Sequence, residues 1–329
     1  MAIIAAVDIG TSRIKALIGR TGKWGVKIDS WRHIHYHHPA LAASGFDPDN
    51  AREYETAQPQ LIEALANLRA ELPRNTQWRI GFNSLHAKLH PMRIQASNCK
   101  RLRIAAEVYR DKLSDHGWRV DYRTLWFDRR LRQGEVMLWA CREKAFEDLL
   151  ITLEQAALKP SVIEFDALAL ASAFERVESA EQKRMLLDFG FAKTIMLFMR
   201  GDTLLHCRVI PRGLASVCER VGQRLNLKLG EVETRITEPQ SEWAKWTEMG
   251  VNELFEPFLL HVQRDLADID EQPAEIYVSG GLANHKAFFH LLENRMNARV
   301  RRFDPLPADE SVPWELHGAF NTAYGLLTR

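Results

Sequence analysis

Two short turns in this sequence each combine an aspartate with a glycine two residues later, and both lie between apolar segments. The first is Asp8-Ile9-Gly10-Thr11-Ser12 and the second is Asp188-Phe189-Gly190. Glycine lets backbone N–H groups approach a phosphate closely, and an aspartate can hold Mg²⁺ through water. Lys15 follows the first turn, and Lys193 and Thr194 follow the second. A single Asp-x-Gly is usually an ordinary hairpin turn, but two facing copies could clamp a triphosphate.

A third glycine-containing turn, Ser279-Gly280-Gly281, follows an apolar strand expected at 275–278. A helix is expected to begin soon afterwards, near Lys286. Glycines at a strand-to-helix junction let a nucleotide lie against bare backbone, and the helix N-terminus favours negative charge. This turn alone is weak evidence. The order of two Asp-x-Gly turns followed by Gly-Gly is much more specific, and it predicts a nucleotide site.

The elements needed to position these turns occur twice in the chain. An apolar strand, a turn and a second apolar strand at 2–18 are repeated at 185–199, which indicates two copies of one unit. Further strands are expected at 24–35, 78–85, 88–95, 121–127, 135–141, 162–165, 203–210 and 275–278, and helices at 57–72, 105–116, 143–158, 167–176, 214–225 and 253–269.

Length and composition limit the classes of protein to consider. With 329 residues, two α/β lobes are expected rather than a single core. The 44 Lys and Arg balance 43 Asp and Glu, so the chain lacks the basic excess expected for nucleic-acid binding. Four widely spaced cysteines without a CxxC pair suggest neither a zinc site nor a disulfide framework, which fits a reducing cytoplasm. Asp8 interrupts the first apolar run too early for a signal peptide, and no apolar run of about 18 residues follows.

The three turns, in this order, resemble the motifs of the actin-like ATPases, a superfamily that includes sugar kinases, heat-shock chaperones of the seventy-kilodalton class and FtsA. The resemblance implies an α/β chain with the two-lobed actin-like (ribonuclease H-like) fold, which binds ATP and Mg²⁺ between its lobes. It identifies the Asp-x-Gly turns as the phosphate 1 and phosphate 2 motifs and the Gly-Gly turn as the adenosine motif. It also implies two connecting helices, one after Phe165 and one at 319–326, where Ala319, Ala323 and Gly325 are small enough for close contact.

The same resemblance assigns roles to individual residues. Asp8 and Asp188 would position Mg²⁺ through water, and Asp166 would orient the attacking water, although Ala167 replaces the proline typical of the chaperones. Ile236 stands where the family places a lysine after its adenosine-side acid, so the resemblance supports phosphate binding more strongly than adenosine binding. At most slow hydrolysis of ATP is expected. The expected phosphate contacts are Gly10, Thr11, Ser12, Lys15, Gly190 and Thr194, and the expected adenosine contacts are Glu233, Gly280, Gly281 and Ala283.

Within this superfamily the chain resembles the PilM family of type IV pilus assembly proteins over nearly its whole length, for example at 147–171, 208–213 and 227–235. In PilM, a groove between subdomains 1A and 1C receives the cytoplasmic N-terminal tail of the inner-membrane protein PilN. A similar PilN-like partner is therefore expected, with membrane contact only through it, and self-association is a further possibility. The implied division is 1A at residues 1–85 and 160–183, an inserted 1C at 86–159, lobe 2 (2A/2B) at 184–310, and a terminal helix at 311–329 that returns to lobe 1.

Three other interpretations remain open at this point. A cytoplasmic subunit of a type II secretion platform would share the fold. An FtsA-like division filament would share subdomain 1C but normally carries a C-terminal membrane-targeting helix, and no such helix is expected at 311–329. A small-molecule kinase would need a base beside its substrate hydroxyl, and the sequence offers no clear candidate.

Two further clusters are interpreted as structural rather than functional. His33, His35 and His37 alternate on an expected strand, but no acid accompanies them, so a solvated strand is favoured over a metal site. Tryptophans and arginines interleave at 118–132 and could stack on nucleic acid, yet the near-zero net charge argues against that partner. The arginines at 129, 130 and 132 could instead meet acidic lipids or a partner tail, although the cluster is short for a membrane patch.

Overall fold

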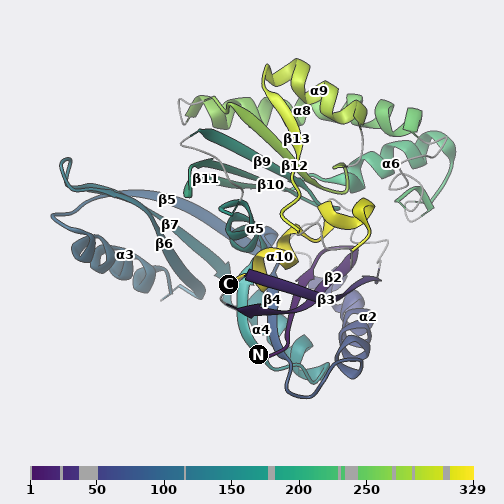
Figure 1. Cartoon of the computed structure of the whole chain (residues 1–329), viewed down its shortest axis with the longest axis horizontal. Helices are drawn as coiled ribbons and strands as arrows, with labels where there is room; N and C mark the ends of the chain where they lie inside the picture. Colours follow the sequence, from purple (N-terminus) through teal and green to yellow (C-terminus); the bar gives the residue numbers. More distant parts are fainter. Residues whose placement is uncertain are drawn as a thin grey trace.

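The computed structural model describes residues 2–22, 25–36, 51–114, 116–176, 182–228, 231–233, 244–268, 272–283, 286–306 and 312–329. Figure 1 shows two stacked lobes, each built on one sheet, and an arm that extends away from their junction. The predicted α/β class and the two-lobed arrangement are confirmed.

The first sheet has the strand order β3-β2-β1-β4-β8. Side chains of the central strand β1 alternate between the two faces of the sheet, because successive side chains of a strand point to opposite faces. Ala5 and Val7 pack with helices α2 and α4, whereas Ile4 and Ala6 face the other lobe, and Asp8 continues this second series. The strands are β1 (Ile4–Ile9), β2 (Arg13–Gly22), β3 (Gly25–His35), β4 (Gln77–Phe82) and β8 (Pro160–Phe165), and the two helices are α2 (Ala51–Ala70) and α4 (Glu143–Gln155).

The second sheet, with the order β11-β10-β9-β12-β13, repeats the first in strand order and in strand direction. Leu187 and Phe189 pack with helices on the outer face, whereas Leu186 faces the core between the lobes, in series with Asp188. The strands are β9 (Lys183–Phe189), β10 (Thr194–Arg200), β11 (Thr203–Ile210), β12 (Glu275–Gly280) and β13 (Arg299–Arg302), and the helices are α6 (Leu214–Leu225), α8 (Ala244–Asp268) and α9 (Lys286–Met296).

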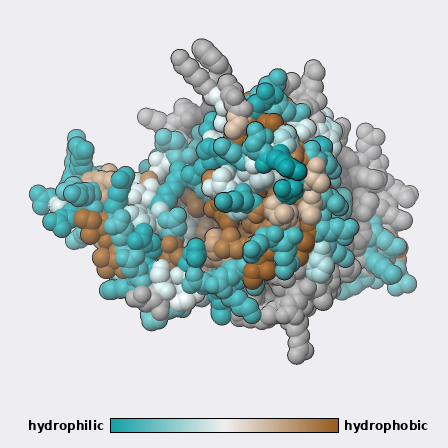
Figure 2. Space-filling model, turned by 90° about the horizontal axis from the view of Figure 1, so that it is seen from below, coloured by the Kyte–Doolittle hydropathy of each residue, from teal (hydrophilic) through white to brown (hydrophobic). Residues whose placement is uncertain are grey.

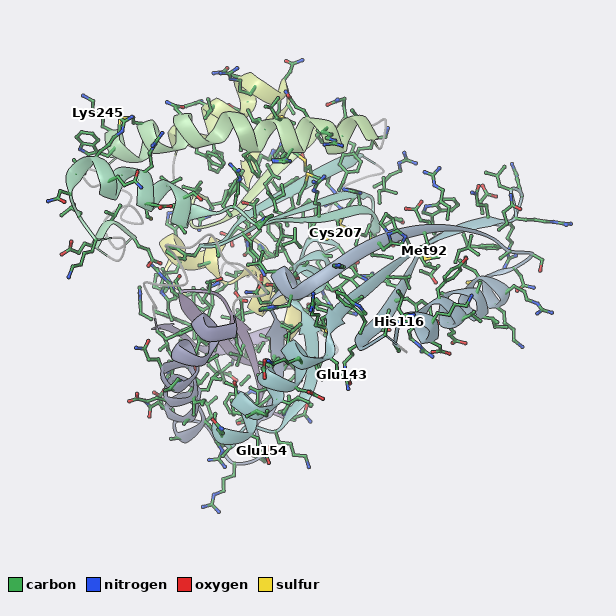
Figure 3. All side chains as sticks on the ribbon, turned by 180° about the vertical axis from the view of Figure 1, so that it is seen from behind. Met92, His116, Glu143, Glu154, Cys207 and Lys245 are labelled. Carbon is green, nitrogen blue, oxygen red and sulfur yellow. The ribbon has the colours of Figure 1, made fainter. Side chains whose placement is uncertain are left out.

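The arm is inserted between β4 and β8 and has its own sheet, with the order β5-β7-β6. Leu102 and Ala106 of α3 pack on Ile94 and Val136, so the arm has a small core of its own. Figure 3 shows Met92 on β5, where this strand runs away from the two lobes. Cys207 of β11 lies in the second lobe, near the place where the arm begins. The elements are the 3₁₀ helix η1 (Ser84–His86), β5 (Ala87–Gln95), α3 (Cys99–Ser114), β6 (Trp118–Asp128) and β7 (Gln133–Arg142).

Two short helices, α5 (Asp166–Phe174) and α10 (Asn321–Leu327), cross between the lobes. The 3₁₀ helix η2 (Trp314–Ala319) precedes α10 in the chain. Gly325 makes the close crossing feasible, because a Cβ there would lie 1.8 Å from the carbonyl oxygen of Ala169. The core around α5 and α10 includes side chains from both sheets, so these helices join the lobes into one body.

The sequence-based expectations differ from the structure at a few elements. Helix α8 begins at Ala244 rather than at 253, α3 begins at Cys99 rather than at 105, and β13 was not expected. Pro59 lies inside α2. His37 and residues 234–236 lie outside the described residues. Within the described part of the chain, no helix combines the length and apolar character needed to cross a bilayer.

Candidate functional site

The β1–β2 turn presents backbone and charge to the space between the lobes. The Gly10 N–H donates to the Arg13 carbonyl at 3.0 Å and closes the turn. A Cβ on Gly10 would lie 3.0 Å from that oxygen and 3.2 Å from Lys15 Nζ, so a larger residue would not fit without movement. Asp8 and Lys15 are paired in the strand register, and Lys15 Nζ lies 2.6 Å from Asp8 Oδ2. The turn therefore holds a carboxylate already neutralised by an ammonium group.

The β9–β10 turn repeats the close glycine geometry in the second lobe, but Asp188 faces Ile195 in the strand register where Asp8 faces Lys15. A Cβ on Gly190 would lie 3.0 Å from the Lys193 carbonyl oxygen. Asp188 lies beside Ser279 of the adjacent strand β12, and the Ser279 hydroxyl donates to its carboxylate. Burial raises the pKa of Asp188 to about 6, although the Ser279 hydrogen bond and nearby Lys15 oppose this shift.

The Gly-Gly turn after β12 lies directly against the second turn. Gly280 has φ +81°, a conformation that favours glycine, and a Cβ there would lie 2.3 Å from the Phe189 carbonyl oxygen. The Gly281 N–H donates to the same oxygen at 2.8 Å. The predicted phosphate 2 and adenosine motifs are thus joined through one carbonyl group.

These three turns surround a cavity of about 100 Å³ between the lobes. Lys15 lines it with a side chain that is 20% exposed; partial burial alone would lower the pKa of this lysine, but the carboxylates of Asp8 and Asp188 raise it above its usual value. The described lining residues are Asp8, Gly10, Thr11, Ser12, Arg13, Lys15, His33, Asp166, Asp188, Phe189, Gly190, Phe191, Lys193, Ile195, Leu214, Glu233, Gly280, Gly281, Ala319 and Thr322.

A second lysine, Lys193, links the two lobes across this cavity. Its Nζ donates to the carboxylate of Asp166, at the start of α5, and to Asn83 Oδ1 at 2.5 Å. The backbone N–H of Ser84 donates to Asp166 Oδ1 at 3.1 Å, and the Ser84 hydroxyl donates to the same oxygen. Asp166 is 4% exposed, so this network satisfies a buried carboxylate entirely with protein groups.

Another ion pair closes the cavity on the side of Glu233. Arg13 Nη2 lies 3.1 Å from Glu233 Oε1, so the first turn of one lobe is tied to the second lobe. His33 lies beside this arginine, with Arg13 Nη1 3.5 Å from its Nε2. Burial and the charges of Arg13 and Lys15 lower the pKa of His33 to about 3, which keeps the imidazole neutral.

The structure brings most of the predicted site residues to this cavity, but two do not line it. Thr194 is buried, and its hydroxyl donates to the Arg212 carbonyl at 2.7 Å. Ala283 is also buried, close enough to Gly318 that a Cβ on that glycine would lie 3.0 Å from the Ala283 Cβ. The predicted residues that do line the cavity are Asp8, Gly10, Thr11, Ser12, Lys15, Asp166, Asp188, Gly190, Glu233, Gly280 and Gly281.

Sequence reasoning missed Asn83 and Ser84, which follow β4. The duplicated sheets offer a signal for them, because β4 occupies the position in the first sheet that β12 occupies in the second. The residues after β4 are therefore the counterparts of the predicted Gly-Gly turn. Arg13 was also missed as a charged group of the site, although it belongs to the first turn.

A separate groove of about 480 Å³ lies between the first sheet and the arm. Aromatic rings form its interior: the Phe82 ring lies 5.4 Å from Phe165 and 6.0 Å from Phe146, measured between centroids. Figure 2 shows apolar atoms gathered near the middle of the face seen from below, with hydrophilic atoms around them. The described lining residues are Phe82, Arg119, Val120, Asp121, Cys141, Phe146, Val162, Ile163, Glu164, Phe165, Leu168 and Arg329.

The groove also has charged groups and exposed backbone edges. Arg119 lies 4.4 Å above the Phe146 ring, and Arg329 forms an ion pair with Glu164. Burial raises the pKa of Glu164, and the charge of Arg329 opposes this shift. Within the described residues, β8 pairs only with β4, and β6 pairs only with β7, so each strand has an unpaired edge.

Comparisons with known proteins bear on the fold. No protein-family model matches the sequence, and no curated protein matches it. A chain of a PilM-PilN type IV pilus biogenesis complex is similar in structure, with a TM-score of 0.79, 19% identity and coverage of 98% of this chain and 97% of that chain.

Two other solved structures are similar over most of their length. The ethanolamine utilization protein EutJ from Carboxydothermus hydrogenoformans has a TM-score of 0.59 and 13% identity, with 100% of this chain and 90% of that chain covered. MreB5 of Spiroplasma citri bound to ADP has a TM-score of 0.52 and 11% identity, with 99% and 95% covered. The predicted likeness to PilM is thus confirmed at the level of the fold, and the chain has the actin-like ATPase fold.

Proposed function

We propose that this chain is an ATP-binding adaptor of type IV pilus assembly that holds the cytoplasmic N-terminal tail of a PilN-like inner-membrane protein. The observation that carries the proposal is the aromatic groove between the first sheet and the arm. The similarity to a chain of a PilM-PilN complex supports it. On this proposal the protein works at the cytoplasmic face of the inner membrane, where its partner places it.

The groove offers two kinds of contact to an extended tail. The unpaired edges of β8 and β6 can donate and accept main-chain hydrogen bonds, as in other cases of strand addition. Phe82, Phe146 and Phe165 provide apolar surface for side chains of the tail. Val162 on β8 is 37% exposed and lines the groove, so it is a suitable residue to perturb.

The residue types that line the cavity between the lobes suit the binding of ATP with Mg²⁺. Gly10, Gly190 and Gly280 bring backbone close to the space, and Asp8 and Asp188 could hold the metal through water. Mg²⁺ would neutralise charge on the phosphates. The cavity of about 100 Å³ is smaller than the roughly 300 Å³ at the lower end of known ligand pockets, so the lobes must separate to admit a nucleotide.

Lys193 can connect nucleotide binding to the groove. Its two acceptors, Asn83 and Asp166, directly follow Phe82 and Phe165, whose rings lie in the groove. If Lys193 turned to a phosphate group, Asn83 and Asp166 would lose their tie to the second lobe. The Phe82–Phe165 pair could then shift with the lobe angle, and tail affinity would depend on the nucleotide.

Calorimetry of the full chain tests this function, with a peptide copied from the N-terminus of a PilN-like partner and with ATP and Mg²⁺ present or absent. We expect peptide binding that ATP alters, and a loss of at least about tenfold in Val162→Asp, because a charge would replace an apolar contact surface of the groove. Leu260→Asp is the matched control, since Leu260 is 65% exposed on α8 and does not line the groove.

Each of the other possible results would favour a different function for this chain. Equal losses in both variants, or no peptide binding at all, would contradict the groove assignment. ATP binding without any response to the peptide would favour a filament-forming protein or a kinase. Absence of both would leave a scaffold that has lost its ligands.

A further inference from the structure

The far end of the arm is strongly basic although the chain as a whole carries a net charge of only +1. The β6–β7 turn and the first turn of α3 meet there, because the Ala96 N–H donates to the Arg132 carbonyl at 2.8 Å. Leu102 of α3 also packs over the start of β7, so close that a Cβ on Gly134 would lie 2.6 Å from it. We call this region the arm tip; its exposed basic residues are Lys100, Arg101, Arg103, Arg129, Arg130 and Arg132.

These charges are not balanced by neighbouring acids. No ion pair joins the six side chains to a carboxylate within the described residues. Asp128 is the nearest acid in the turn, and its Oδ1 accepts from the backbone N–H groups of Arg130 at 2.7 Å and Leu131 at 3.1 Å. That carboxylate shapes the turn, and the arginine head groups remain available to an anionic partner.

Exposed apolar side chains lie among these charges. Leu131 lies in the β6–β7 turn and is 69% exposed. Full burial of a leucine side chain would contribute about 2 kcal/mol of hydrophobic free energy, which an exposed leucine does not gain. On α3, Ile104 and Val108 are 40% and 48% exposed and lie one helical turn apart. Basic residues beside exposed apolar ones on a helix and a turn are typical of surfaces that lie on a bilayer.

We propose that the arm tip docks directly on an anionic lipid surface, with arginines at the phosphates and Leu131 among the acyl chains. A membrane fits this surface because the arm extends away from the two lobes (Figure 1) and its basic and apolar side chains are exposed together. The arm also shows apolar atoms on the same face as the central apolar area (Figure 2). Docking of this face would therefore turn the groove towards the membrane from which a partner's tail emerges.

This inference goes beyond the proposed function and contradicts the expectation that membrane contact comes only through a partner. Its test needs neither a peptide nor a nucleotide, so the two proposals can fail separately. Purified full chain is sedimented with phosphatidylcholine vesicles that contain or lack phosphatidylglycerol, over a series of salt concentrations. We expect binding only to the anionic vesicles, with weakening as salt screens the charges.

Two variants of the arm tip sharpen the test. Each cationic residue near an anionic bilayer contributes roughly fivefold in partitioning, so replacing Arg101, Arg129 and Arg130 together by Gln should lower it on the order of a hundredfold. Leu131→Gln should lower binding at every salt concentration. The matched control replaces three exposed cations outside the arm by Gln: Arg74, Lys159 and Arg299.

Partitioning that falls in the arm-tip variants but changes little in the control would support direct docking. Equal losses in the triple variant and the control would mean that only total charge matters, and would overturn the proposal. Failure of the wild type to bind anionic vesicles would overturn it as well. If the tip instead binds an acidic polypeptide such as polyglutamate and ignores vesicles, the surface belongs to a protein partner and the lipid assignment is wrong.

Discussion

Replacing Lys193 by Met tests the link between the lobes at its centre. The Lys193 side chain is 11% exposed and that of Asp166 is 6% exposed, so the substitution leaves a buried carboxylate without its ammonium partner. Removing one partner of a buried ion pair typically costs about 3–5 kcal/mol. Asp166 keeps its two hydrogen bonds from Ser84 and lies at the N-terminus of α5, which favours negative charge. We therefore expect about 3 kcal/mol, the lower end of the range.

Urea unfolding of the full chain measures this cost, and a double-mutant cycle isolates the pair. In an Asp166→Asn background the carboxylate is gone, so Lys193→Met should then cost much less. We expect a coupling energy of about 2 kcal/mol between the two positions. Lys159→Met is a control for loss of one positive charge, because Lys159 is exposed and should contribute little.

A cost below about 1 kcal/mol for Lys193→Met, or additivity of the two substitutions within about 0.5 kcal/mol, would contradict a stabilising buried pair between Lys193 and Asp166. A second measurement concerns coupling to the groove. In Lys193→Met, ATP should no longer change the affinity for the tail peptide. A nucleotide effect of unchanged size in a folded variant would show that the signal passes elsewhere.

Three further predictions concern other parts of the molecule. Gly325→Ala should lower the free energy of unfolding by about 3 kcal/mol in the same urea experiment, because the new Cβ would overlap Ala169. The control Gly81→Ala should lower it by less than about 1 kcal/mol, because no atom lies nearer than 3.4 Å to a Cβ at that position. His33 has a folded pKa of about 3 against 6.5 in the unfolded chain, so the unfolded state binds more protons below pH 6.5 and stability should fall as the pH decreases. His33→Gln should remove about 2 kcal/mol of this loss near pH 4, less than the full shift implies because the ring is partly exposed; unchanged pH dependence of the urea midpoint would contradict this. Lys15→Met should weaken ATP binding about tenfold or more in calorimetry, because it removes a charged donor from the cavity, and equal affinity in the variant and wild type would exclude that role.

Much of the fold and part of the site could be predicted from local patterns. The alternation of side chains along β1 and β9 places Asp8 and Asp188 on the faces turned towards the other lobe, and glycine at 10, 190 and 280 marks turns with little room for a side chain. These features depend on residues close together in the chain. The repeat of the hairpin unit was predictable for the same reason.

The polar contacts that cross the cavity were not predictable in this way. Arg13 and Glu233 are 220 positions apart, and Lys193 lies 110 positions from Asn83. Whether such groups meet depends on how closely the lobes approach, and this distance is set by the packing of α5 against α10. The sequence around Lys193 therefore shows no partner for this lysine, although in the folded chain its ammonium group neutralises the carboxylate of Asp166.

The groove and the arm tip also combine features that the sequence predicts with features that only the folded chain creates. The resemblance to PilM implied an insert at 86–159, and the sequence itself shows arginines at 129, 130 and 132. The aromatic walls of the groove come from β4, α4 and β8, and their distances depend on how the insert docks on the first sheet. Strand and turn periodicity is a property of neighbouring residues, and it can be inferred from the order of amino acids. The shape of a cleft depends on the packing of distant elements, so it becomes visible only when the chain has folded.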